Sequence, residues 1–195
     1  MIRHAPTAVK KGFLPEDNAP AVLDSKKIKN LALSIPANCT WHVSPLKRTV
    51  QTADALSAYI TAGEIRIEES LKEQNFGDWS GEKISDVWEE LKQNKNQHNY
   101  SFICPETSPP NGENFLEQCK RVSLWLENTQ FIESTSIVIT HSGTIRAILS
   151  HILKIEPDIA IGINVSHLKK TIFEIIPEDN DKNRGGRFCL LGINE

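Results

Sequence analysis

Two histidines stand where apolar, strand-like stretches end. His4 follows Met1-Ile2-Arg3, and His141 follows the β-branched run at residues 136–140. In an α/β sheet, residues at the carboxyl ends of the strands face the crevice where ligands bind. A neutral imidazole in that crevice can act as a nucleophile or a base, so His4 and His141 are candidate catalytic residues. Taken alone, each could equally be a packed histidine without a chemical role.

Arg48 is a candidate for binding an anion in the same crevice. The expected strand at residues 41–43 stops at Ser44-Pro45, so Arg48 would project from the first turn of the helix that follows. A guanidinium suits a phosphate because its planar fork binds two oxygens. Residues 142–144 (SGT) open another helix, and the free N–H groups of a helix N-terminus also attract anions. The alternative for Arg48 is a solvent-exposed position on its helix.

Glu73 is the candidate carboxylate. It lies in residues 71–81 (LKEQNFGDWSG), a segment with two glycines and two large aromatic side chains. Such a segment is a poor solvated turn, and we expect it to fold over a neighbouring surface. Its aromatic walls could shield the carboxyl group from water, as a general acid requires. The alternative is a surface glutamate beside a packed aromatic loop.

Together, these segments resemble the motifs of the histidine phosphatase superfamily, also called phosphoglycerate mutase-like. The matching segments are residues 3–7 (RHAPT), 44–53 (SPLKRTVQTA), 71–81 and 140–146 (THSGTIR). Each motif is weak alone, but all four occur in the family's order between residue 3 and about residue 150. Residues 110–114 (PNGEN), followed by Arg121, are similar to the family's Pro-x-Gly-Glu-Ser segment.

The resemblance implies a role for each candidate residue. His4 would attack phosphorus in line and form a phosphohistidine, which water then hydrolyses. Arg3, Arg48 and His141 would neutralise the phosphoryl oxygens. Glu73 would protonate the leaving oxygen in the first step and take a proton from water in the second. With the charge neutralised by side chains, the reaction is expected to need no metal and no cofactor. Further substrate-binding residues are expected at Thr7, Lys10 and Ser142.

The expected activity is therefore hydrolysis of a small phosphate monoester. Small bacterial phosphatases of this family that act on α-ribazole 5′-phosphate are similar in length and in the loop with the candidate carboxylate. That ester is one candidate, beside sugar phosphates, nucleotides and phosphoproteins. A small phosphorylated molecule is thus the expected partner. The oligomeric state stays open, with a dimer as one alternative.

Two other functions stay open. A mutase would pass the phosphoryl group to a second hydroxyl, but the segment between Gly81 and Pro110 is short and lacks an obvious basic cluster, which favours hydrolysis. A phosphate-binding protein without turnover is the second alternative. It is suggested by Ala5 and Ser142, which replace glycines common in the family, and by Lys10, where many members have asparagine.

The composition is that of a soluble globular protein. Of 195 residues, 39% are hydrophobic and 24% charged, which fits a single domain over residues 1–195. The net charge of −3 argues against binding to nucleic acid or to a membrane surface. No apolar run reaches the ~18–20 residues of a membrane span. No cationic, apolar leader precedes the first motif, so we expect a cytoplasmic protein.

The elements that must position these residues alternate along the chain. Expected helices cover residues 24–34, 47–60, 82–94, 113–128 and 143–153, and expected strands cover 41–43, 65–67, 136–140, 171–176 and 187–192. This order predicts a three-layer α/β fold with a mixed, mostly parallel sheet and helices on both faces. The two tail strands are adjacent and predict an antiparallel pair.

Two loops and the first strand carry further expectations. The polar loops 11–20 and 98–112 are expected to form the substrate rim, with Phe13, Leu14 and Trp79 as candidate apolar contacts. For Trp79, packing in the core or in the loop is the favoured alternative. Only two residues precede Arg3, fewer than is usual in the family. Either the natural start lies upstream, or the protein tolerates a short strand. We expect so short a strand to destabilise the fold and to hold the Arg3-His4 pair poorly.

Overall fold

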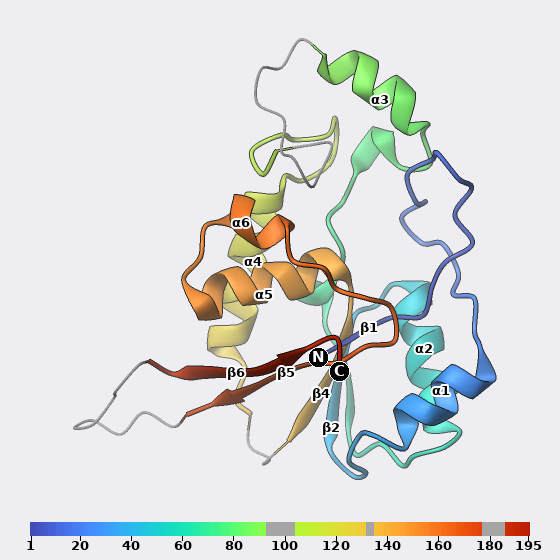
Figure 1. Ribbon diagram of the computed structural model, residues 1–195, viewed down its shortest axis with the longest axis vertical. Coiled ribbons are helices and arrows are strands. Elements are labelled where there is room, and N and C mark those ends of the chain that lie inside the picture. The colour runs from blue at the N-terminus through green and yellow to red at the C-terminus, as the bar shows by residue number, and fades with distance from the viewer. Residues whose placement is uncertain (93–103, 132–134, 177–185) are drawn as a thin grey trace.

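The computed structural model describes residues 1–92, 104–131, 135–176 and 186–195 (Figure 1). The first part of the predicted rim loop, residues 98–103, lies outside these ranges. A four-stranded sheet forms the centre, and its strands run in the order β1-β4-β2-β3. All three strand pairs are parallel. The strands are β1 (Ile2–Arg3), β2 (Thr40–Val43), β3 (Ile65–Ile67) and β4 (Ser136–Thr140).

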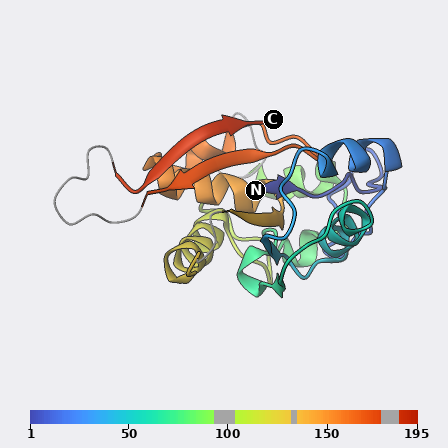
Figure 2. The same cartoon turned by 90° about the horizontal axis from the view of Figure 1, so that it is seen from below.

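Helices cover both faces of this sheet, as predicted (Figure 2). One face packs on α1 (Ser25–Ala32) and α2 (Lys47–Ser57), and the other packs on α4 (Phe115–Asn128), α5 (Ser142–Leu153) and α6 (Pro157–Ile161). Side chains alternate along β4, so Ile137 and Ile139 enter the first core and Val138 enters the second. Burial on both sides explains the nearly continuous apolar run of this strand.

The antiparallel pair predicted for the tail lies outside the central sheet. Strands β5 (Thr171–Ile175) and β6 (Phe188–Ile193) form a separate two-stranded ribbon. An antiparallel bridge between Ile2 and Lys170 connects the ribbon to β1, and two hydrogen bonds between the backbones of Met1 and Thr171, at 2.7 and 2.8 Å, accompany it. The central sheet is therefore entirely parallel, and the mixed character of the fold comes from this ribbon.

The short first strand is bonded along both sides of its carboxyl end. His4 N–H donates to Thr140 O on β4, at 2.9 Å. On the opposite side, Leu168 N–H donates to Arg3 O at 3.0 Å, and Arg3 N–H donates to Lys169 O at 3.3 Å. The structure thus holds the Arg3-His4 pair firmly, against the expectation of a poorly held motif. The expected loss of stability stays a prediction.

The helix boundaries follow local capping. Asp24 accepts hydrogen bonds from the first turn of α1, as the sequence predicts. Asn114 and Glu117 form a capping box, which starts α4 two residues later than the predicted helix. Helix α2 ends at Ser57 instead of residue 60, because the chain tightens into a turn around Leu56 O.

A small third core stands over the site region. Helix α3 (Ile84–Leu91), at the top of Figure 1, packs through Val87 and Leu91 on Leu14 and Trp79. Two short 3-10 helices, Glu69–Leu71 and Gly77–Trp79, flank the segment with Glu73. Trp79 is thus a packing residue, as expected. Among the described residues, no helix has the length and apolar character needed to cross a bilayer.

Candidate active site

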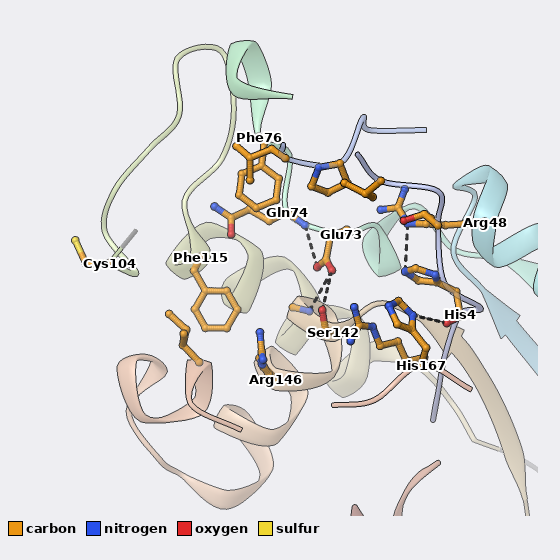
Figure 3. Close-up of a pocket in the computed structure, with 17 residues that line it drawn as sticks. His4, Arg48, Glu73, Gln74, Phe76, Cys104, Phe115, Ser142, Arg146 and His167 are labelled. Atoms are coloured by element: carbon orange, nitrogen blue, oxygen red, sulfur yellow. Dashed lines mark hydrogen bonds between the residues drawn. The ribbon is translucent and has the colours of Figure 1, made fainter. Parts of the chain in front are cut away.

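A cavity of about 450 Å³ lies at the carboxyl ends of the central strands, where the sequence predicted the crevice. Figure 3 shows His4, Arg48 and His167 at one end and Phe76 and Phe115 at the other. The charged lining comprises Arg3, Arg48, Glu73 and Arg146, and the apolar lining includes Val9, Leu14, Pro15, Phe76, Phe115 and Ile161. The cavity therefore combines a cationic end with an apolar end.

His4 presents one defined nitrogen for chemistry. Its Nδ1 lies 2.6 Å from Ala5 O, and a carbonyl oxygen only accepts, so Nδ1 carries the proton. The lone pair is then on Nε2, which accepts from Arg48 Nε at 3.3 Å. Burial, together with nearby Arg48, His167 and Arg3, lowers the pKa of His4 to about 3, although the bond to Ala5 opposes this shift. At pH 7 the ring is neutral and nucleophilic.

Arg48 projects from the first turn of α2, as predicted, and it is buried. Its Nε donates to His4 Nε2 at 3.3 Å and to His141 Nδ1 at 3.2 Å, and its Nη1 donates to Asp17 O at 2.6 Å. The helix itself is tied to the first motif, because Ala5 N–H donates to Thr52 Oγ1 at 3.0 Å. One guanidinium thus joins both histidines.

His141 lies next to His4 but does not line the cavity. It is fully buried, and its ring centroid lies 4.9 Å from that of His4. Its Nδ1 accepts from Arg48, so Nε2 carries the proton and donates to Ser44 Oγ at 2.8 Å. Burial first, and then nearby Arg48, hold the pKa of His141 well below its usual value. A direct contact between His141 and substrate stays a prediction.

Glu73 occupies the N-terminus of α5, which the sequence assigned to an anion. Its Oε2 accepts from Gly143 N–H at 3.2 Å and from the Ser142 hydroxyl at 3.4 Å, and its Oε1 accepts from Gln118 Nε2 at 3.1 Å. A Cβ added at Gly143 would lie 2.3 Å from Glu73 Oε1, so a side chain at this position would displace the carboxylate from its place. With Gln74 N–H, which donates to Oε1 at 3.3 Å, the carboxylate accepts four hydrogen bonds, and its side chain is only half-buried.

Arg121 anchors the backbone beside Glu73. Its guanidinium pairs with both carboxylate oxygens of Glu113 and donates to the carbonyl oxygens of Ser70, Lys72 and Glu73. Glu113, from the segment at residues 110–114, and Arg121 thus hold the backbone of the loop that carries Glu73. The segment at residues 110–114, which resembles the Pro-x-Gly-Glu-Ser segment of the family, therefore has a structural role.

Two further arginines, Arg3 and Arg146, line the cavity. Arg3 Nη1 donates to Val165 O at 2.5 Å, and Arg146 Nε donates to Ile163 O at 2.8 Å. Burial lowers the pKa of both guanidinium groups, and the Glu73 carboxylate opposes that shift. Three guanidinium groups and one carboxylate leave two positive charges, which complement a phosphate monoester dianion.

The predicted substrate-binding residues separate into two groups. Thr7 and Ser142 line the cavity. Lys10 is exposed outside the lining, and its ammonium lies 4.4 Å from the centroid of the Phe13 ring. Phe13 is likewise absent from the lining, whereas the neighbouring Leu14 forms part of it.

Two basic side chains of the lining, Arg146 and His167, were not given a role in the sequence analysis. Arg146 lies four residues after Ser142 on α5, so helical spacing places both on one face and could have identified it. His167 follows α6 in a loop without any periodic pattern or motif. Only the three-dimensional fold brings it beside His4, with ring centroids 5.1 Å apart.

In the ranges that the structure describes, no three His, Cys, Asp or Glu side chains form a cluster suited to a metal ion.

Solved structures share this fold over the whole chain. A candidate alpha-ribazole-5′-P phosphatase from Escherichia coli has 21% identity and a TM-score of 0.77, covering 100% of this chain and 94% of that one. A mycobacterial glucosyl-3-phosphoglycerate phosphatase has 18% identity and a TM-score of 0.74, covering 100% and 96%. A phosphoserine phosphatase from Entamoeba histolytica, solved with 3-phosphoglyceric acid, has 20% identity and a TM-score of 0.72, covering 100% and 94%.

Comparison of the amino-acid sequence with known proteins gives a match to a family model. No curated protein sequence matches the chain at a significant level. The model of the histidine phosphatase superfamily, branch 1, matches residues 26–184. This match spans most of the chain and includes Arg48, Glu73 and His141. The chain therefore belongs to the histidine phosphatase superfamily, branch 1, and is an enzyme of the phosphatase class.

Proposed function

We propose that the protein is a metal-independent phosphomonoesterase that works through a phosphohistidine on His4. The observation that carries this proposal is the fixed tautomer of His4, with its Nε2 lone pair at the cationic end of the cavity. In the first step Nε2 attacks phosphorus, the N–P bond forms and the ester P–O bond breaks. In the second step water attacks the phosphohistidine and releases inorganic phosphate.

Arginine side chains supply the charge stabilisation. Negative charge spreads over the equatorial phosphoryl oxygens in the transition state, and fixed cations lower its energy. Arg48 touches the attacking nitrogen, and Arg3 is adjacent to His4 in the chain. The Nε of Arg3 is buried without a hydrogen-bond partner in the described ranges, so a phosphoryl oxygen would satisfy it. Release of His4 Nε2 from Arg48 must precede attack.

Glu73 is positioned for proton transfer. It lies between the nucleophile end and the apolar end of the cavity, where a leaving oxygen would sit (Figure 3). Its Oε2 is positioned by hydrogen bonds from the Ser142 hydroxyl and Gly143 N–H at the α5 N-terminus. As a carboxylate it would take the proton from the attacking water in the second step. Its protonated form would deliver the proton to the leaving oxygen in the first step.

The apolar end supports an ester with a flat, uncharged group. Phe76, Phe115 and Leu14 offer ring and aliphatic surface, and none of them carries charge. α-Ribazole 5′-phosphate, named for one structural relative, has an aromatic base and is our candidate substrate. Sugar and nucleotide phosphates, phosphoryl transfer to a second hydroxyl, and phosphate binding without turnover are the outcomes that a substrate panel would distinguish.

The nucleophile is tested by hydrolysis of phenyl phosphate in excess EDTA. We expect wild-type activity to survive EDTA and the His4→Ala variant to lose more than about 10³-fold in kcat, because the covalent step is removed. His151→Ala is the matched control, since His151 pairs with Glu127 outside the cavity lining. Loss of wild-type activity in EDTA, or full activity of His4→Ala, would contradict the proposal.

The role of Glu73 is tested by varying the leaving group. Glu73→Gln should reduce kcat/KM for an alkyl phosphate by about 10²- to 10⁴-fold, and much less for 4-nitrophenyl phosphate, whose leaving group needs no proton. The exposed Glu69→Gln serves as the control in the same loop, because Glu69 pairs with Lys72 and does not line the cavity. Equal losses on both esters would argue against an acid role.

The apolar end is tested by removing one ring. Phe76→Ala should lower kcat/KM about tenfold for phenyl phosphate and little for glycerol phosphate, because only the aryl ester uses that surface. Phe13→Ala is the matched control, since Phe13 packs under Lys10 outside the lining. An equal effect of Phe76→Ala on both esters would show that the ring acts on stability or on the phosphate end.

A further inference from the structure

The loop after α6 carries His167 to the nucleophile. Its backbone is fastened to β1 on either side of that residue, by Val165 O, which accepts from Arg3 Nη1, and by Leu168 N–H, which donates to Arg3 O. Leu168 has φ +56°, a left-handed conformation that a leucine rarely adopts. Strain of this kind persists where the surrounding structure demands it, and here it accompanies a side chain that lines the cavity.

The ring of His167 is oriented by one hydrogen bond. Its Nδ1 lies 2.9 Å from His4 O, and since a carbonyl only accepts, Nδ1 is the protonated nitrogen (Figure 3). Within residues 1–92, 104–131, 135–176 and 186–195, no hydrogen bond occupies Nε2. The mechanism described above makes no use of this nitrogen.

The charges around His167 determine when it is protonated. Arg3 and His4 face it from β1 and Arg48 faces it from α2, while Glu73 and Arg146 complete the charged lining. Burial first, and then Arg3 and Arg48, lower the pKa of His167, whereas its bond to His4 O opposes the shift. The ring is therefore neutral in the free protein at pH 7. A neutral Nε2 offers a lone pair, which would repel a phosphoryl oxygen.

We propose that His167 is a phosphoryl-binding residue that takes up a proton from solvent when the anion enters and then donates an Nε2–H bond to one of its oxygens. A dianion at His4 would offset the positive charge of Arg3 and Arg48, which removes the main electrostatic obstacle to the imidazolium. The proposal rests on the proposed function only for the position of the anion. It adds a fourth cation that exists only in the loaded site.

Proton uptake on binding determines whether the affinity for the anion rises or falls with pH. If the pKa of His167 is higher in the complex than in the free protein, anion affinity rises as the pH falls between those two values. Each proton taken up contributes at most about tenfold in affinity per pH unit. His4 is next to the same anion and can contribute similarly, so the His167 share must be isolated by substitution.

The test uses sulfate, a tetrahedral dianion that does not itself titrate near neutral pH. The imidazole signal of His167 is assigned by its loss in His167→Asn and titrated by NMR with and without saturating sulfate. We expect sulfate to raise the pKa of His167 by at least about one unit. An unchanged titration, or the absence of saturable sulfate binding, would overturn the proposal.

Two variants give an independent readout. His167→Asn keeps a donor for His4 O and removes Nε2, whereas His167→Gln offers an amide N–H that cannot titrate. In the wild type, sulfate affinity should rise as the pH falls from about 8 to about 6, and His167 should contribute up to about tenfold per pH unit to that rise. Both variants should lose this contribution. His167→Gln should also bind sulfate more tightly than His167→Asn. Identical pH dependence in all three proteins would refute the assignment. Because neither readout needs turnover, a protein that shows these effects without hydrolysis would refute the phosphatase mechanism alone.

Discussion

The hydrogen bond from His4 Nδ1 to Ala5 O decides what the site can do. It fixes the tautomer, so that the nitrogen with the lone pair faces Arg48 and the cavity. That bond is formed within the first motif and depends on a short strand held by β4 on one side and by the loop around Leu168 on the other. The same Ala5 also donates to Thr52, which places α2 and its arginine. Nucleophile and cation are therefore positioned by one connected backbone unit.

Charge balance is the second constraint. Burial first, and then the guanidinium groups that suit a phosphate, lower the pKa values of His4 and His141 and keep both rings neutral at pH 7. Glu73 offsets part of that charge and is itself held at the N-terminus of α5. The glycine at position 143 leaves room for this carboxylate, which a larger residue would displace. The site therefore stays cationic while the Glu73 carboxylate is hydrogen-bonded and the His4 ring is neutral.

The sequence predicts elements whose causes are local and misses contacts that depend on the fold. The apolar run of β4 and the Asp24 cap of α1 are local signals, and the predicted strand and helix start are confirmed. The ends of strands place His4, Arg48 and Glu73 around one crevice, because the topology of parallel sheets constrains where they meet. His167 could not be found this way, since its loop has no periodicity and its partner lies 163 positions earlier. The exclusion of Lys10 and Phe13 from the cavity lining likewise depends on their mutual packing.

The central claim is a covalent bond between His4 and phosphorus, and the most direct test is to trap it. Wild-type protein would be mixed with phenyl phosphate, quenched in alkali during turnover, digested and mapped by mass spectrometry. The account predicts a base-stable, acid-labile phosphate on the peptide that contains His4, and specifically on its imidazole. Phosphate on any other residue, or hydrolysis without a phosphorylated peptide, would contradict it.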